Sequence, residues 1–310
     1  MPVSTGTASD YADLLSRLRT FMSANGWTSL RWTGAEYIAR GEGLGGTDEI
    51  FIGIDTQVDA GADWYNWRLN GMTGFDDAQA FNAQPGNIVL SAAANFPRVH
   101  LWNAPILYWF VVNGRRILVV AKVSTVYQVC YLGLIKPYLP PTALPYPLVV
   151  AGTSTASAGA RWSTQHVTHS LGVTMPVCAN ASTVESDILS NPRSSCRFWH
   201  GEWHGVQHYY NSSTSYATRW KCLFPYASGS GYRYGRLRTN PLDAGYALTP
   251  VTLQFAHPSK NIFGELDGVY HISGFSNAAE NIVTIAGVDH LVVQNVYRNS
   301  PSDFCAIRLE

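Results

Sequence analysis

The stretch Ile106–Val123, ILYWFVVNGRRILVVAKV, decides the fold of this chain. Two runs rich in β-branched and aromatic residues flank Asn113-Gly114. Asn-Gly is the strongest short-range signal for a β-hairpin, because a two-residue type I′ turn needs positive φ at both central positions. The arms are too apolar for a hairpin with one face in water. We therefore expect both faces to be covered, either by the rest of the chain or by another subunit.

Composition predicts a substantial core and a weakly charged surface. The 310 residues suffice for one large domain or two ordinary ones, and 46% of them are hydrophobic. Only 14% are charged, with 21 basic and 21 acidic residues and a formal net charge of +0. Such a surface protects a free monomer poorly from association. We therefore expect much of it to be covered in an assembly; the alternative is a monomer kept soluble by Ser, Thr and Asn.

The same features argue against several classes of protein. The balanced charge and the lack of a basic run argue against nucleic-acid binding. The opening MPVSTGTASDYADLL has no charged region followed by an apolar core, so no secretory signal is expected. Residues 113–116 interrupt the most apolar window, so no membrane span is expected. The scattered cysteines form no CxxC pair and are typical of buried free thiols in reducing cytosol: Cys130, Cys178, Cys196, Cys222 and Cys305.

Hydrophobic periodicity predicts one helix followed by strands. Apolar residues recur at helical spacing at Tyr11, Leu14, Leu15, Leu18, Phe21 and Met22. Ser9 or Asp10 can cap this helix, and Asn25-Gly26 supplies a left-handed stop. Strands are expected at 30–32, 36–40, 49–55 and 64–69, with 99–107 leading into the hairpin. Segment 76–82 suits a short helical turn, and 124–134 suits either a strand or a short buried helix.

The second half of the sequence predicts short strands and turns. Strands are expected at 197–210, 217–224, 232–238, 251–255, 268–272, 280–286, 290–297 and 304–309, with a hairpin loop at Gly287-Val288-Asp289. We interpret 1–136 as an N-terminal α+β domain, 137–160 as a Pro/Gly/Ser-rich connector and 161–310 as a C-terminal β-rich domain. The predicted fold class is a β-rich α+β protein. Its helix packs on a sheet that includes the hairpin, and a mostly antiparallel, sandwich-like region follows.

Two motifs suggest ligands but lack the required context. Gly41, Gly43 and Gly46 match GxGxxG, yet the loop leads from one strand into another, whereas a dinucleotide site needs it to open a helix. His200, His204 and His208 invite a zinc interpretation. Glycines between them oppose a helix, and on a strand residues four apart are about 13 Å apart, too far to share one ion. We therefore predict no cofactor and no metal.

Catalytic groups and glycan-stacking aromatics are equally unsupported. The carboxylate groupings Asp76-Asp77 and Glu185/Asp187 lie in turn-like contexts, and no GxSxG or HExxH motif occurs. Clusters such as 64–67 and Tyr232/Tyr234 could stack on sugars, but core packing explains them better. The sequons at Asn180 and Asn211 carry no meaning without a secretory signal. We predict no enzyme and assign no catalytic, cofactor-binding or metal-binding residue.

Long segments resemble the structural proteins of tailed bacteriophages. They are DLLSRLRTFMSANGWT (13–28), GLGGTDEIFIGI (43–54), DWYNWRLNGMTGF (63–75), LWNAPILYWFVVNGRRILVVAKVSTVYQVCYLGLIKPY (101–138) and the C-terminal 265–310. The resemblance covers over half the chain, is weakest between 151 and 249, and rests on no short diagnostic motif. It implies a virion component of the tail or baseplate, assembled in the bacterial host cytoplasm, and it transfers no catalytic residues.

The expected function is therefore structural. The chain would act by oligomerising and by docking to other virion proteins, through the hairpin, the connector at 137–147 and the C-terminal strands. One alternative is a receptor- or glycan-binding module on the particle, with a host-surface glycan as its partner, and another is a capsid or neck component. A hydrolase would need two carboxylates about 5–10 Å apart in a groove, which the sequence does not place.

Overall fold

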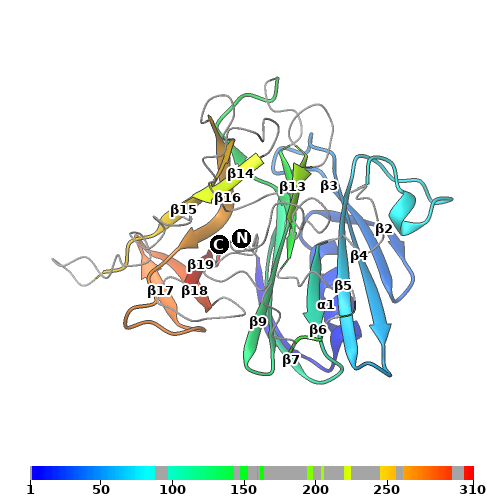
Figure 1. Ribbon diagram of the computed structural model, residues 1–310. Helices are drawn as coiled ribbons and strands as arrows, with labels where there is room; N and C mark the ends of the chain where they lie inside the picture. Colours follow the sequence, from blue (N-terminus) through cyan, green and yellow to red (C-terminus); the bar gives the residue numbers. More distant parts are fainter. Residues whose placement is uncertain are drawn as a thin grey trace, which may run out of the picture.

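The computed structural model describes residues 2–87, 97–142, 147–152, 159, 161–163, 194–197, 204–205, 220–224, 245–255, 261–294 and 304–310. Their strands form three antiparallel sheets that stack as layers (Figure 1). A central sheet, sheet A, lies between sheet B at the right of the view and sheet C at the left. The chain is β-rich, with a helix near its N-terminus and sandwich-like sheets, which confirms the predicted α+β class.

Sheet A contains the predicted hairpin. Its strand order is β1-β7-β8-β9-β11-β12-β13. These strands span Val3–Ala8, Ile106–Asn113, Arg116–Val123, Val126–Leu134, Leu148–Gly152, Ser194–Arg197 and His204–Gly205. The segment that suited either strand or helix forms β9, which pairs with β8 along its whole length. Strand β1 was not expected from the sequence, and it extends the sheet by pairing with β7.

Strand β8 shows that the central sheet is buried on both faces. Ile117, Val119 and Ala121 pack in a core shared with the helix and sheet B. Leu118 and Val120 point the other way, into a core shared with sheet C. All five are at most 1% exposed, and burying one such valine, leucine or isoleucine is worth about 1.5–3 kcal/mol. The cover expected for the hairpin arms therefore comes from the rest of the same chain.

Sheet B and the helix form the layer against one face of sheet A. The strand order of sheet B is β2-β3-β4-β5-β6. These strands span Trp27–Trp32, Glu36–Gly41, Ile50–Asp59, Trp64–Met72 and Arg98–Leu101, and the helix α1 spans Tyr11–Ser23. After β5 a loop folds back over the outer face of sheet B and carries the 3₁₀ helix η1, Phe81–Ala83. This single turn lies at the end of the predicted helical turn.

Helix α1 follows the predicted pattern closely. The side chain of Asp10 caps it, because its Oδ1 accepts hydrogen bonds of 2.8 Å from the N–H groups of Ala12 and Asp13. The buried stripe is the predicted one: Leu14, Leu15, Leu18 and Met22 are 0% exposed. The helix ends at Ser23, and Gly26 takes the positive φ (+88°) that turns the chain into β2.

Sheet C covers the opposite face of sheet A. Its strand order is β14-β15-β16-β19-β18-β17, and β10 also pairs with β16. These strands span Trp220–Phe224, Thr249–Phe255, Asn261–His271, Phe304–Arg308, Val288–Gln294 and Ile282–Ile285, and β10 spans Lys136–Pro137. The predicted strand at 232–238 and most of 197–210 lie outside the described residues.

The hairpin turn does not have the predicted form. Asn113 pairs with Arg116, so the turn residues are Gly114 and Arg115, and neither has positive φ. The side chain of Asn113 explains the shift: its Oδ1 accepts from the N–H groups of Arg115 and Arg116, both at 2.9 Å. An asparagine before the turn residues can satisfy them in this way without a type I′ turn. The predicted type I′ turn at Asn113-Gly114 is therefore wrong, although the hairpin itself is confirmed.

Gly114 is required because another loop approaches it closely. Its carbonyl accepts from the N–H of Gly43 at 3.0 Å. A Cβ on Gly114 would lie 2.6 Å from the carbonyl oxygen of Gly43, closer than real Cβ atoms come. The glycine loop, residues 42–49 between β3 and β4, thus packs on the turn of sheet A.

A positive-φ turn occurs elsewhere, in the last hairpin. Ile285 pairs with Val288, which leaves Ala286 (φ +53°) and Gly287 (φ +80°) as the turn residues. Positive φ at both positions is the type I′ pattern. The predicted loop Gly287-Val288-Asp289 is therefore displaced, since Val288 already belongs to β18.

Pairing across the predicted connector involves two of the sheets. Residues 148–152 form β11, which pairs with β9, and β12 at 194–197 pairs with β11 in turn. Pro137 pairs in β10 with Gly264 of β16. The division into 1–136, 137–160 and 161–310 stays a prediction.

Candidate functional site

The outer face of sheet B carries a row of charged side chains across four strands. In the strand register Glu36 lies opposite Asp55, Asp55 opposite Arg68, and Arg68 opposite Arg98. Because directly paired residues point to the same face, the four side chains form one transverse row. We call these residues the charged row. They lie on the face of sheet B that is turned away from α1.

Ion pairs and hydrogen bonds neutralise the charged row internally. Arg68 Nη2 lies 2.5 Å from Asp55 Oδ2. Arg98 Nη1 donates to Gln57 Oε1 at 2.6 Å. Both guanidinium groups are largely buried, since Arg68 is 8% exposed and Arg98 1%. Buried arginines need such partners, because an unpaired charge away from water is strongly unfavourable.

Burial also shifts the pKa values of this row. Burial raises the pKa of Asp55, and the neighbouring charge of Glu36 adds to this, while Arg68 opposes it. Burial lowers the pKa of Arg98 to about 10, and the adjacent Arg68 contributes in the same direction. Arg98 therefore remains protonated at neutral pH. The row contains two arginines and two carboxyl groups, so its basic and acidic side chains are balanced in number.

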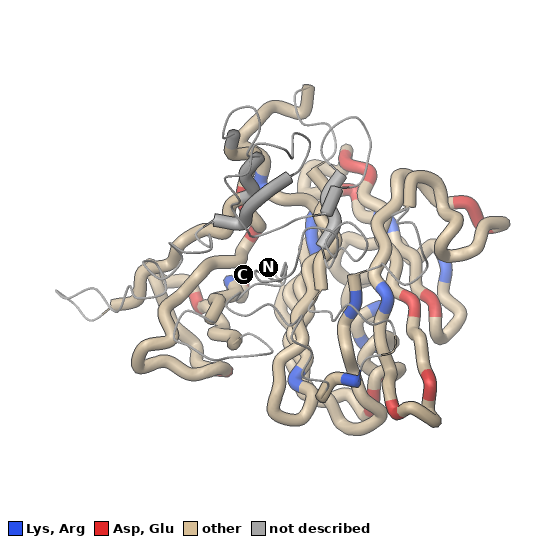
Figure 2. Tube along the Cα trace, viewed as in Figure 1, with Lys and Arg blue, Asp and Glu red and all other residues tan. Residues whose placement is uncertain are grey.

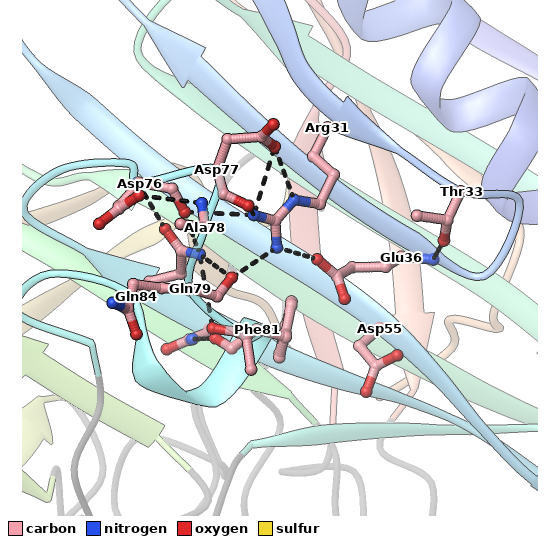
Figure 3. Close-up of polar contacts among 12 residues, drawn as sticks. Arg31, Thr33, Glu36, Asp55, Asp76, Asp77, Ala78, Gln79, Phe81 and Gln84 are labelled. Carbon is pink, nitrogen blue, oxygen red and sulfur yellow. Dashed lines mark hydrogen bonds and ion pairs between the residues drawn. The ribbon is translucent and has the colours of Figure 1, made fainter.

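Arg31 extends the row and fastens a loop over the sheet (Figure 3). Its Nη1 donates to Glu36 Oε1 at 2.8 Å and to the Gln79 carbonyl at 2.9 Å. Its Nη2 donates to the carbonyls of Asp76 and Asp77 at 3.1 and 2.7 Å. One guanidinium thus binds a strand carboxylate and several backbone carbonyls of the loop. We call residues 73–87 the sheet-B loop.

The side chain of Gln84 holds the sheet-B loop together by hydrogen bonds to its backbone. Its amide nitrogen donates to the carbonyls of Asp76 and Gln79 at 2.9 and 2.8 Å, and its Oε1 accepts from the N–H of Asp76 at 2.9 Å (Figure 3). The Gln84 side chain is almost fully buried. Satisfying backbone groups in this way fixes the loop in one conformation.

Phe81 packs the sheet-B loop onto the face of sheet B that carries the charged row, at the apolar end of that face. It forms a small core with Ile38, Phe51 and Met72. A Cβ on Gly53 would lie 2.7 Å from the Phe81 ring, so the ring rests directly on the strand backbone. The Arg68 guanidinium stands 4.8 Å from the Phe81 ring centroid, which joins the apolar end to the charged row.

The charged row has the residue types of an acid–base site but not the arrangement. Glu36 and Asp55 are neighbours across β3 and β4, the kind of carboxylate pair that the sequence did not place. Each of them is engaged by a guanidinium, Glu36 by Arg31 and Asp55 by Arg68. Two carboxylates held in separate ion pairs are suited to fastening strands and a loop. They are less suited to exchanging protons with a substrate.

A second buried polar network joins sheets A and C. Arg116, directly after the hairpin turn, is 0% exposed, and its Nε lies 3.2 Å from Asp267 Oδ2 on β16. Lys136 Nζ lies 3.4 Å from the other oxygen of Asp267. The Tyr131 hydroxyl accepts from the Asp267 N–H at 3.3 Å and donates to the Leu134 carbonyl at 2.6 Å. We call this the interlayer network.

The residues singled out in the sequence are mostly structural where they are described. Trp67 is buried in the core between sheets A and B, and Tyr65 is buried with its ring centroid 5.0 Å from that of Tyr11 on α1, which agrees with packing rather than sugar stacking. Asp77 is exposed, and it contributes to the Arg31 contacts described above. Cys130 and Cys305 are both buried, and burial raises the pKa of Cys130 to about 12.

Several predicted groups lie wholly or partly outside the described residues. His204 belongs to β13, while His200 and His208 are outside, as are Glu185, Asp187, Tyr232, Tyr234 and both sequons. Within the described ranges no group of three or more His, Cys, Asp or Glu side chains is placed to hold a metal ion. In the same part of the chain, no helix is both long and apolar enough to cross a membrane.

Comparison with known proteins assigns no family. No protein-family model matches the chain, and no curated protein matches it.

Proposed function

We propose that the chain is a structural subunit of a bacteriophage virion, of the tail or baseplate, that acts by binding copies of itself and other virion proteins. The resemblance of the segments between 13 and 138 and of 265–310 to tailed-phage structural proteins supports this assignment. The ion-paired state of the carboxylates in sheet B supports a role without catalysis.

The observation that carries the proposal is the nature of the sheet edges. Among the described strands, the three sheets end in β1 and β13, β2 and β6, and β14 and β17, each with a neighbour on one side only. The sequences of β1 (VSTGTA) and β17 (IVTI) contain no charge and no proline. Monomeric β proteins usually place charged residues or prolines on their edge strands, because an unprotected edge pairs with other chains. Edges of this kind suit a protein that joins neighbours.

The weakly charged surface supports the same role. Figure 2 shows basic and acidic residues of the described parts scattered along the trace, with both signs on sheet B. With a formal net charge of +0, copies experience little overall repulsion when they approach. The hairpin arms are buried in the chain itself, so the proposed docking surfaces are the sheet edges and the C-terminal strands rather than the hairpin faces.

The test is the location of the chain in the infected host. Purified particles of the phage that encodes it are analysed by mass spectrometry, and a tagged copy of the chain is located on particles by electron microscopy. We expect the chain in purified particles in a fixed ratio to the other virion proteins, with the label at the tail or its end. A chain abundant in the lysate but absent from purified particles would contradict the proposal.

A further inference from the structure

Strand β17 is the edge of sheet C that is best suited to pairing with another chain. It forms the outer end of the sheet, at the left of Figure 1, and pairs with β18 on one side only among the described strands. Residues 281–287, NIVTIAG, contain no charged residue. Ile282 is 51% exposed, although isoleucine is among the most often buried residue types. The edge therefore combines free backbone groups with an exposed apolar side chain.

The register of the last hairpin shows which backbone groups are free. The carbonyl of Asn281 accepts from the N–H of Val292. Hydrogen-bonded pairs alternate along an antiparallel ladder, so Val283 and Ile285 make the next bonds to β18. Ile282 and Thr284 then direct their N–H and C=O groups away from β18, toward the open edge.

We propose that β17 joins two copies of this chain by antiparallel pairing about a two-fold axis. In the favoured register Val283 lies opposite Val283 of the second copy, and Ile282 lies opposite Thr284 of the second copy. In this register the outward N–H and C=O groups of Ile282 in one copy face those of Thr284 in the other copy. The two-fold axis repeats the same pair of hydrogen bonds on its other side. The register also keeps the side chains of both residues on one face of a continuous sheet, as antiparallel pairing requires.

We expect the partner of β17 to be the β17 strand of a second copy, because the edge is complementary to itself. Centring the axis on Thr284 would instead place Ile282 opposite Ala286, whose φ of +53° takes it out of the extended conformation. The uncharged strand and the net charge of +0 leave no electrostatic barrier between copies. So short a strand buries little area, and the pairing is weak in dilute solution. It becomes effective where subunits are held close together, and in this respect the inference rests on the proposed virion role.

The experiment is sedimentation velocity of the purified full-length chain over a wide range of concentration. We expect a concentration-dependent dimer. Thr284→Pro removes an outward N–H and leaves the bonds of Val283 and Ile285 to β18 in place, and Ile282→Lys puts a charge on the edge. Each should lower the association constant at least about tenfold. Thr284→Val, which keeps the N–H and loses only the hydroxyl bond to Asp289, should dimerise like the wild type.

The outcomes separate this inference from the proposed function. Circular dichroism and thermal unfolding verify that each variant is folded; if Thr284→Pro does not fold, Ile282→Lys decides. A wild-type chain that stays monomeric up to its solubility limit, or variants that dimerise as the wild type does, would overturn the β17 pairing. The chain's presence in purified particles would then still support the virion role. Conversely, the chain could dimerise through β17 and yet be absent from purified particles. That result would support the β17 pairing and overturn the proposed virion role.

Discussion

Arg116 and Asp267 are 151 residues apart in sequence, yet the Arg116 Nε lies 3.2 Å from the Asp267 Oδ2. The pair joins the first residue after the central hairpin turn to β16 of sheet C. Arg116 is 0% exposed and Asp267 is 3% exposed, so water screens the pair little. Gly268, at φ +73°, makes room for the guanidinium, because a Cβ there would lie 2.4 Å from Arg116 Nη2.

Removing one member of this pair should destabilise the fold strongly. Arg116→Met leaves Asp267 buried without its main partner, and we expect a loss of about 3–5 kcal/mol in the free energy of unfolding. Replacing both with Arg116→Met and Asp267→Leu should cost less than the sum of the single changes, because no charge is stranded. Urea denaturation measures the free energy of unfolding of the single and double variants. Arg17→Ala, which breaks the exposed pair with Asp13, is the control and should barely change the midpoint.

The same pair predicts a loss of stability in acid. Burial raises the pKa of Asp267, but the charges of Arg116, Lys136 and Arg308 outweigh it and hold that pKa below its ordinary value in the folded state. The stabilisation is therefore complete above the ordinary aspartate pKa of about 3.9 and is lost as the pH falls through the lower, folded value. The difference in unfolding free energy between the wild type and Asp267→Asn should shrink from neutral pH into this acid range. A difference that stays constant with pH would contradict the assignment.

Gly114→Ala tests the contact between the glycine loop and the hairpin turn. The new Cβ would collide with the Gly43 carbonyl, and we expect a loss of about 1–3 kcal/mol, typical of overpacking. Gly45→Ala is the matched control in the same loop, since its Cβ would meet nothing closer than the Thr47 hydroxyl oxygen at 3.8 Å. Denaturant midpoints compare the two. Equal effects would show that the contact is not specific.

Ala286→Asn should stabilise the last hairpin. Ala286 holds φ at +53°, a region that asparagine occupies more readily than alanine. We expect a gain of up to about 1 kcal/mol, read as a higher thermal midpoint. Ala278→Asn, at an exposed loop position without positive φ, should give no such gain. If both variants gain equally, the backbone explanation fails.

Arg31→Met should release the sheet-B loop without unfolding the protein. The guanidinium contacts with Glu36 and with the carbonyls of the loop are lost, while the Phe81 core remains. Hydrogen exchange followed by mass spectrometry should show faster exchange in 73–87 and little change in β7–β9. Arg40→Met removes an arginine from longer contacts with Glu42 and Glu49, both 3.5 Å, and should leave exchange in the loop unchanged.

Local features of the fold could be predicted because their signals are local. The leucine spacing of α1 and its Asp10 cap are confirmed, as are the central hairpin and its need for cover on both faces. Sequence could not decide whether that cover came from the same chain, because periodicity shows that a face is apolar and not what meets it. The turn was misplaced because the Asn113 side chain bonds to the residues after it, an effect that outweighed the Asn-Gly preference.

Long-range relations were out of reach of the sequence. Strand β1 was missed because VSTGTA is weakly apolar and its partner in sheet A lies about a hundred residues later. The charged row was missed for a similar reason. Glu36, Asp55, Arg68 and Arg98 look like scattered surface charges until the strand register aligns them. The interlayer network likewise depends on the stacking of sheets A and C, which no short motif encodes.

The doubly covered central sheet also has a consequence for synthesis. Strands β7 to β9 are neighbours in sequence and can pair as soon as they leave the ribosome, but most of the strands that shield Leu118 and Val120 lie beyond residue 248. Until that part has been translated, the nascent chain presents a broad apolar face to solvent. Premature termination in this interval would leave a product that aggregates or needs a chaperone, however well its N-terminal layers have folded.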